Sequence, residues 1–363
     1  MTPLAWVIAV FLTAQTAVMV WNLWYWVGRR FIISDPAVTV SVLIPARNEL
    51  HSLPRLLAAL QAQVYRPVEI IICDDGSDDG LTEWLASHAA EYGVTWFRAP
   101  EKPEGWVGKT WACHQLGQRA QGDWLLFLDA DIVPNPSFIR LLAGLMTDTP
   151  AQMVTAFPRL RPSDLVDGLL ECMVGFIVFT LIPLQLSEKP HHLRTAFANG
   201  QVIGFRREEY RRLWPHQEVC GSIVDDVELA RQVKRRGQSV LLVEATAEFE
   251  VRMYRNGWEA IDGFAKNSVS AAGGLWAAVA QVPLVALWWL VPLVFAISGE
   301  LWAVGACGLT ALLFGTCAKL GCLPWWYGLC YPLAMLLGEF VLLRSILWHL
   351  RGQVRWKGRT YRL

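Results

Sequence analysis

Long apolar runs near both ends of the chain enclose a central segment of ordinary soluble composition. The first run extends over 24 residues, from Leu4 to Val27, and three more follow at 275–298, 301–318 and 327–350. About 20 consecutive apolar residues suffice to cross a bilayer as a helix. The sequence therefore predicts a membrane protein. The 19 tryptophans and the mean hydropathy of +0.31 agree with this interpretation.

Basic residues beside these runs predict an orientation. Arg29 and Arg30 follow the first run, and five basic residues without an acidic one occupy the closing segment 351–363. Because basic residues gather on the cytoplasmic side, we expect an uncleaved anchor at 1–30 with its N-terminus outside. The same rule predicts a cytoplasmic basic tail after the C-terminal membrane helices at 271–350, in the cell inner membrane or plasma membrane.

The number of runs conflicts with this orientation. Three spans after a cytoplasmic domain would place the tail outside. Either one run lies in the membrane interface, or the apolar stretch at 165–186 is a further span. Asp167 and Glu171 in that stretch favour an interfacial helix, because carboxylates are costly inside a bilayer.

The central segment, 38–270, has the pattern of an α/β domain. Short apolar strands at 38–44, 68–74, 94–97, 123–129 and 152–157 alternate with helical patterns. This alternation predicts a mostly parallel, Rossmann-like sheet with helices on both faces. Ligands bind such sheets at the carboxyl ends of the strands.

Charge and cysteine usage exclude some function classes. The chain holds 32 basic and 32 acidic residues, so nothing in its net charge predicts nucleic acid as a partner. Its eight cysteines form no C-x-x-C pair, and its histidines form no zinc-type array. We therefore expect reduced, structural cysteines and no zinc site.

Asp129 ends the apolar strand "DWLLFLD", and Asp131 follows two residues later. Strand alternation sends both carboxylates to the same face, where they repel one another unless a cation lies between them. Mg²⁺ and Mn²⁺ are commonly held by one or two carboxylates together with substrate phosphates. A metal–diphosphate site is one interpretation. A solvated turn before Pro134 is the other, and for this motif alone both stay open.

Two other strands end in polar clusters at the same predicted sheet edge. The first gives Pro45, Arg47 and Glu49, and the second gives Asp75. We expect Asp75 to accept an N–H of a nucleobase and Arg47 to contact a phosphate group. Glu49 either binds a ribose hydroxyl or caps the following helix. Three such clusters at one edge favour a binding site over three independent turns.

The motifs "VSVLIPARNE", "ICDDGSDDG", "GKTWACHQLGQRAQGDWLLFLDADI" and "IVDDVELARQVKRRG" occur in this order. Over about 38–270 they resemble the family 2 glycosyltransferases of GT-A fold. The resemblance implies that Pro45, Arg47, Glu49 and Asp75 hold the nucleoside of a UDP-sugar. It also implies that Asp129 and Asp131 hold Mg²⁺ or Mn²⁺ with the diphosphate.

The resemblance further implies that Asp226 is the catalytic base of an inverting transfer. Asp225 and Asp226 open a helical pattern that ends in basic residues, an arrangement that the helix dipole alone would also explain. No Q-x-x-R-W box follows, which favours a single transfer over polymer synthesis. The "GKT" at 108–110 lacks Walker spacing, because Pro103 stands where glycine is needed.

Lys109 is predicted either to assist the diphosphate or to be a surface lysine. Asn199, Gly200 and Gln201 are expected to line the acceptor pocket. Arg252, Arg255 and Lys266 either reach the diphosphate or anchor the domain at the membrane.

Membrane runs on both sides of the domain predict an acceptor that resides in the bilayer. "AFANGQVIGFRREEY" and "WKGRTY" resemble bacterial carotenoid glycosyltransferases of the hydroxychlorobactene and diaponeurosporenoate types. This resemblance implies transfer of glucose from UDP-glucose to an oxygenated carotenoid. Two alternatives remain. One is transfer to another lipid, such as ceramide, diacylglycerol, a hopanoid or polyprenyl phosphate. The other is a non-catalytic membrane scaffold.

Overall fold

The computed structural model describes residues 2–27, 29, 31, 33–222, 224–356 and 359–362, with side chains described as far as Gln353. Arg30 and Lys357, both predicted to face the cytoplasm, lie outside the described residues. The chain forms two compact units. Unit 1 comprises Met1–Gly28, Leu160–Leu184 and Arg252–Leu363, and unit 2 comprises Arg29–Arg159 and Gln185–Val251.

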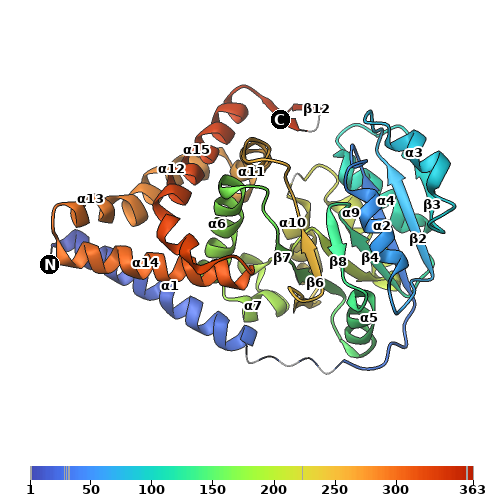
Figure 1. Ribbon diagram of the computed structural model, residues 1–363, viewed down its shortest axis with the longest axis horizontal. Helices are drawn as coiled ribbons and strands as arrows, with labels where there is room; N and C mark the ends of the chain where they lie inside the picture. The colour runs from blue at the N-terminus through green and yellow to red at the C-terminus, as the bar shows by residue number, and fades with distance from the viewer. Residues whose placement is uncertain are drawn as a thin grey trace. The chain divides into compact units, whose positions relative to one another are not determined.

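Unit 2 is built around a seven-stranded sheet with the order β3-β2-β1-β4-β8-β6-β9. β1 pairs in parallel with β2 and β4, whereas β8 runs antiparallel to both β4 and β6. The predicted mostly parallel α/β fold is confirmed (Figure 1). The strands are β1 (Val40–Ala46), β2 (Glu69–Asp74), β3 (Thr95–Arg98), β4 (Trp124–Leu128), β6 (Met153–Phe157), β8 (Val202–Arg206) and β9 (Val240–Glu244).

Helices cover this sheet because their apolar residues recur at helical spacing. In α2 the buried residues are Leu53, Leu56, Leu57 and Leu60, which form one face. The central strand β4 is buried at every position, as a strand covered on both faces must be. The helices of this part are α2 (Leu53–Gln61), α3 (Leu81–His88), α4 (Gly108–Arg119), α5 (Phe138–Asp148), α7 (Leu184–Glu188), η1 (Leu193–Thr195), α8 (Arg207–Leu213), α9 (Pro215–Glu218) and α10 (Asp225–Arg235).

Two small sheets complete the strand inventory of the described residues. The first has the order β5-β10-β7 and the second pairs β11 with β12. Their bounds are β5 (Ile132–Pro134), β7 (Arg159–Leu160), β10 (Phe249–Val251), β11 (Gln353–Trp356) and β12 (Arg359–Arg362).

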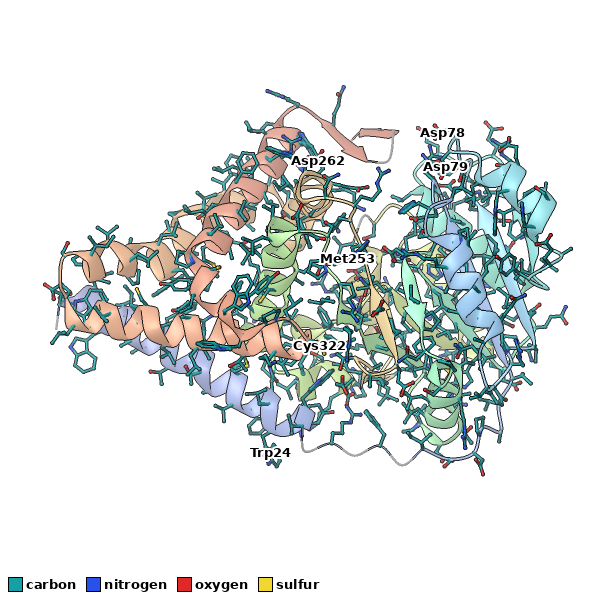
Figure 2. All side chains as sticks on the ribbon, in the orientation of Figure 1. Trp24, Asp78, Asp79, Met253, Asp262 and Cys322 are labelled. Carbon is teal, nitrogen blue, oxygen red and sulfur yellow. The ribbon has the colours of Figure 1, made fainter. Side chains whose placement is uncertain are left out.

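Unit 1 is a bundle of apolar helices. Four helical segments among the described residues are long and apolar enough to cross a membrane: Pro3–Val27, Leu275–Ile297, Leu301–Leu320 and Trp325–Leu350. Many of their large side chains point outwards, as Trp24 does from the first segment (Figure 2). The elements are α1 (Pro3–Val27), α6 (Leu165–Leu181), α11 (Gly257–Ala271), α12 (Leu275–Val285), η2 (Ala286–Leu290), α13 (Val291–Ile297), α14 (Leu301–Leu320), η3 (Trp325–Cys330) and α15 (Tyr331–Leu350).

A buried amide joins α1 to the end of α6. The Asn22 side-chain nitrogen donates to the carbonyl oxygens of Phe179 (2.9 Å) and Ile182 (2.8 Å). Its side-chain oxygen accepts the backbone N–H of Leu184 at 2.9 Å. Backbone groups at a helix end have no partners within the helix, so an outside group must satisfy them. Asn22 does this where the predicted stretch 165–186 breaks at Pro183.

Replacing this amide should destabilise unit 1. In an Asn22→Ala variant, three backbone groups lose their partner, and a buried group costs on the order of 1–3 kcal/mol when left unsatisfied. We expect a clear decrease in the melting temperature of the detergent-solubilised protein. The matched control is Thr13→Ala on the same helix, because the exposed Thr13 hydroxyl bonds to the Ala9 carbonyl one turn earlier in its own helix. Equal melting temperatures for the two variants would contradict the assigned role.

Candidate active site

The strand register brings the predicted polar clusters to one edge of the sheet. Ala46 at the end of β1 pairs with Asp74 at the end of β2, and Leu43 pairs with Phe127 of β4. The segments beginning at Arg47, Asp75 and Asp129 therefore leave neighbouring strands at their carboxyl ends. This is the edge at which ligands bind in such sheets.

Arg47 and Glu49 are held by the loops of this edge. The Arg47 guanidinium donates to the carbonyl oxygens of Asp75 (2.6 Å) and Gly76 (2.8 Å). The buried Glu49 carboxylate accepts the Ser52 hydroxyl at 2.6 Å, just before α2 begins. The Ser52 contact is local to the start of α2, and both roles expected for Glu49 stay predictions. Arg47 fixes the loop after β2, and its predicted contact with phosphate stays a prediction.

Asp74 and Asp75 have different contacts in the loop after β2. Asp74 is fully buried, and its carboxylate accepts the backbone N–H of Ser77 (2.9 Å) and the hydroxyl of Thr82 (2.5 Å). It therefore has a structural role. Asp75 is tied to β1 through its backbone N–H, which donates to the Ala46 carbonyl at 2.8 Å. Pro45, one residue earlier on β1, is half-buried.

Lys109 lies in the first turn of α4 and forms an ion pair with Asp129. Its Nζ is 2.7 Å from Asp129 Oδ1, and both side chains are partly accessible to solvent. Burial alone would lower the pKa of Lys109, but the carboxylates of Asp129 and Asp225 together raise it well above its usual value. The lysine is therefore a permanent positive charge in the first turn of the helix, beside the end of β4.

A short loop connects Asp129 with Asp226. The backbone N–H of Asp129 donates to the Gln201 carbonyl at 3.0 Å, and the N–H of Gly200 donates to Asp226 Oδ2 at 3.2 Å. Asp226 Oδ1 accepts the N–H of Val227 at 2.8 Å, within the first turn of α10. Thr155 of β6 anchors the loop through two 2.9 Å bonds with the backbone of Asn199. Residues 199–201 thus bring two of the predicted site carboxylates into one arrangement.

The electrostatic surroundings of Asp226 suit a base. Burial and the neighbouring negative charge of Asp225 raise the pKa of Asp226 to about 6, while Lys109 acts in the opposite direction. A general base works best when its pKa lies near the operating pH. Asp226 therefore combines ionisation at neutral pH with useful basicity.

A tether that the sequence did not predict holds α4 against the segment before α10. The Cys220 carbonyl accepts the N–H of Val107 (2.7 Å) and lies 2.7 Å from the hydroxyl of the fully buried Thr110. This contact links residues more than 100 positions apart, so no local sequence pattern predicts it. It fixes the start of the helix that carries Lys109 relative to the segment that carries Asp225 and Asp226.

Asp131 lies half-buried between β4 and β5, two residues after Asp129. Within the described ranges, no three His, Cys, Asp or Glu side chains converge in the manner of an all-protein metal site.

Arg252, Arg255 and Lys266 belong to unit 1, whereas the other predicted site residues belong to unit 2.

Comparison with known proteins identifies the domain. Residues 41–205 match the family model described as Glycosyl transferase family 2. These residues form a family 2 glycosyltransferase domain. This glycosyltransferase is 27% identical over 293 residues to a 4,4'-diaponeurosporenoate glycosyltransferase of Staphylococcus haemolyticus (strain JCSC1435), covering 75% of this chain and 73% of the relative. It is 25% identical over 342 residues to the protein of that name in Staphylococcus aureus (strain MRSA252), covering 89% and 88%.

A solved structure supports the fold. A mannosyltransferase from Pyrobaculum calidifontis, in complex with GDP-Man and Mn²⁺, aligns with 96% of the glycosyltransferase and 99% of its own chain. The TM-score is 0.56 and the identity is 16%. At this identity the likeness shows the shared fold alone. The predicted GT-A architecture is thereby confirmed, and the roles of individual residues stay predictions.

The pKa of Asp226 predicts how the glycosyltransferase responds to pH. A raised carboxyl pKa means that the proton is retained up to a higher pH, so the base is lost as the pH falls through about 6. At about pH 5, roughly one tenth of the molecules hold an ionised Asp226, and kcat/KM should be about tenfold below its plateau. The measurement is the pH profile of kcat/KM. A profile that stays flat down to about pH 5 would contradict the assignment.

Proposed function

We propose that the glycosyltransferase moves a sugar, glucose from UDP-glucose, to an oxygen of a membrane-resident lipid of the carotenoid type, with inversion at the anomeric carbon. The observation that carries the chemical part is the 199–201 loop, which bonds to both Asp129 and Asp226. These bonds support our proposal that Asp129, on the diphosphate side, and Asp226, as the base, act in one site. The names of the two staphylococcal relatives support the acceptor class.

Asp226 performs the proton transfer in this proposal. It takes the proton of the acceptor hydroxyl while the acceptor oxygen attacks the anomeric carbon. The bond between that carbon and the diphosphate oxygen breaks, and its electron pair leaves with the nucleoside diphosphate. One displacement inverts the anomeric centre. Lys109 offers a fixed positive charge to the departing diphosphate from the first turn of α4.

The carboxylates of Asp129 and Asp131 fit a divalent cation that is shared with substrate. Magnesium-type sites in proteins commonly use one or two carboxylates, with phosphate and water oxygens completing the shell. Mg²⁺ or Mn²⁺, when bound there, would supply positive charge that stabilises the diphosphate leaving group.

The lipid part of the proposal is supported by unit 1. Its helices at Pro3–Val27, Leu275–Ile297 and Leu301–Leu320 have the length and composition of membrane spans, and they carry exposed apolar side chains. We propose that they embed the enzyme in the cell membrane with unit 2 on the cytoplasmic side, where nucleotide sugars are made. A long apolar acceptor would then reach the enzyme by diffusion within the bilayer.

The decisive experiment follows sugar from donor to lipid. Membranes containing the full chain are incubated with labelled UDP-sugars, Mg²⁺ or Mn²⁺ and added oxygenated carotenoid, and the label in the solvent-extractable fraction is identified. Label in a carotenoid band with the wild type and not with Asp226→Asn supports the proposal and names the sugar. Label in a ceramide, diacylglycerol, hopanoid or polyprenyl fraction overturns the carotenoid assignment. Binding of UDP-sugar without any transfer supports the scaffold alternative.

A further inference from the structure

The last apolar segment, Trp325–Leu350, has the length and composition of a membrane span. Its contacts within unit 1, however, show that this segment follows a path other than a straight crossing. The chain passes from one unit to the other at four junctions, 28/29, 159/160, 184/185 and 251/252. We refer to the part of unit 1 next to these junctions as the proximal end. The end of α14 lies there, because the carbonyl of Gly321 accepts the backbone N–H of Leu160 at 3.0 Å.

From the proximal end the chain turns back along α14. A Cβ on Gly315 would lie 2.9 Å from the carbonyl oxygen of Trp325, and a Cβ on Gly328 would lie 2.4 Å from that of Ala311. The two segments therefore touch through their backbones, which only glycine allows at these positions.

Three residues after Gly328, the returning chain has reached the first third of α14. Tyr331 lies beside Cys307. Thirteen residues separate Cys307 from the helix end at Leu320, a distance of about 20 Å along the axis. This is well into a hydrocarbon core of about 30 Å.

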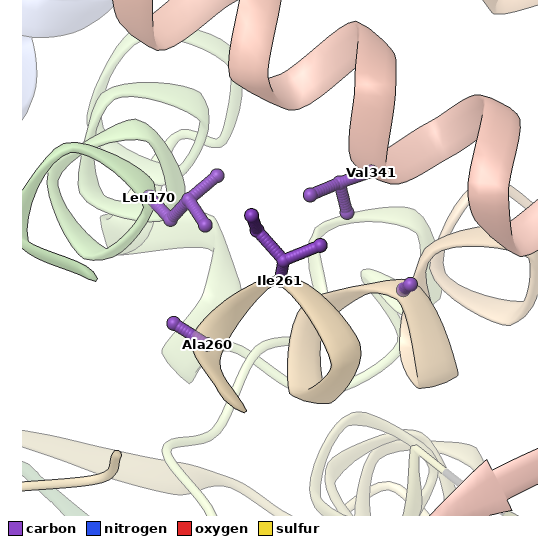
Figure 3. Packing of buried hydrophobic residues seen from close by; sticks show 5 residues of the cluster. Leu170, Ala260, Ile261 and Val341 are labelled. Carbon is purple, nitrogen blue, oxygen red and sulfur yellow. The ribbon is translucent and has the colours of Figure 1, made fainter. Parts of the chain in front are cut away.

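α15 then returns to the proximal end. Val341 packs against Leu170 of α6 and Ile261 of α11 (Figure 3). One turn later, the Ser345 hydroxyl accepts the backbone N–H of Val269 at 3.1 Å. Ile346 packs with Ala278, the fourth residue of α12. The first part of Trp325–Leu350 thus begins four residues after Gly321, which contacts Leu160 beside the 159/160 junction. The last part contains Val341, which packs against the first half of α6 and the first half of α11, the helices that follow the 159/160 and 251/252 junctions.

We infer that Trp325–Leu350 does not cross the bilayer but forms a re-entrant hairpin. It enters and leaves the membrane on the side where unit 2 lies, and one face of it contacts lipid acyl chains. This inference rests on the membrane location proposed above. It resolves the conflict between the number of apolar runs and the basic tail, because three crossings leave the tail on the side of unit 2.

The lipid-facing surface of the hairpin is a continuous apolar stripe on α15. Its residues recur every three or four positions and are 43% to 66% exposed within the protein: Leu333, Leu336, Phe340, Leu343, Leu347 and Leu350. The opposite face is buried against the bundle. A stripe of this length is typical of a protein surface that contacts lipid, and acyl chains are the partner that matches its chemistry.

Labelling with a membrane-impermeant maleimide tests the inference in sealed vesicles of both orientations. The test uses the full chain with Cys220 and Cys322 replaced by serine. Three cysteine variants in this background report on which side of the membrane three positions lie. Asp78→Cys reports an exposed loop of unit 2, Ser298→Cys the connection between α13 and α14, and Arg351→Cys the residue after α15. We expect Asp78→Cys and Arg351→Cys to label from one side and Ser298→Cys from the other.

The outcomes separate the hairpin from the membrane location. If Arg351→Cys labels from the same side as Ser298→Cys, α15 crosses the bilayer and the inference is wrong. If all three positions label in both vesicle types and an alkaline wash releases the protein, the membrane location fails, and the hairpin fails with it.

A pair of glycine variants tests the hairpin itself. In Gly328→Ala the new methyl group would collide with the Ala311 carbonyl, whereas Gly308→Ala adds a methyl group in open space on α14. We expect Gly328→Ala to increase labelling of the half-buried Cys330 by a permeant maleimide at least twofold over wild type. Gly308→Ala should leave it unchanged. Identical labelling in the two variants would count against the close approach.

Discussion

Replacing Asp226 by asparagine should lower kcat by about 10³-fold, since a positioned base contributes roughly 10²–10⁴-fold to such a step. Asparagine has the same shape, and its single side-chain oxygen can still accept the backbone N–H of Gly200 although the bond from Val227 is lost, so the loop at 199–201 should keep its place. The affinity for UDP, measured by calorimetry on the solubilised enzyme, should change less than twofold. Loss of turnover with unchanged donor affinity assigns Asp226 to the chemical step.

The neighbouring Asp225 provides the matched control for this prediction. Its negative charge is one of the causes that raise the pKa of Asp226. An Asp225→Asn variant should therefore stay active and should show the acid limb of its pH profile at a lower pH. If Asp225→Asn is instead the variant that loses turnover, the roles of the two residues are exchanged and our assignment of the base is wrong.

Replacing Asp131 by asparagine should affect the metal requirement. The variant retains the ion pair between Lys109 and Asp129 but loses one of the two carboxylates at the end of β4. We expect the Mn²⁺ concentration for half-maximal activity to rise at least about tenfold, and kcat/KM at low Mn²⁺ to fall on the order of 10²–10³-fold. The measurement is activity as a function of Mn²⁺ at a fixed UDP-sugar concentration.

Asp78→Asn is the control for Asp131→Asn. Asp78 lies exposed in the loop after β2 (Figure 2) and has no assigned role in binding metal. This variant should show the metal dependence of the wild type. An unchanged Mn²⁺ requirement in Asp131→Asn would remove Asp131 from the metal site and leave Asp129 as its candidate ligand.

The position of the site could be predicted from sequence because it depends on local patterns. Apolar strands end where polar residues begin, and parallel pairing then brings Arg47, Asp75 and Asp129 to one edge whatever the remaining details are. The contacts made at that edge depend on distant residues and could not be predicted. The tether between Thr110 and Cys220 joins segments 110 residues apart.

The hydrogen-bond partners of individual side chains could not be predicted from the sequence either. Arg47 reads as a phosphate ligand, yet it donates to two backbone carbonyls of the neighbouring loop. Two roles were open for Glu49, and only the structure shows its bond to Ser52. Similarly, Trp325–Leu350 has the hydropathy of a span. Length and composition do not distinguish a crossing helix from a hairpin of the same residues, because both bury apolar surface in lipid.

The way the two units share the chain has a practical consequence for dissecting the enzyme. Unit 2 consists of two stretches, and the segment Leu160–Leu184 between them belongs to unit 1. Removing the terminal helices would therefore not release a water-soluble catalytic fragment, since the apolar helix α6 would remain in the middle of it. A soluble version would require an internal deletion that joins Arg159 to Gln185 with a polar linker, in addition to trimming both ends.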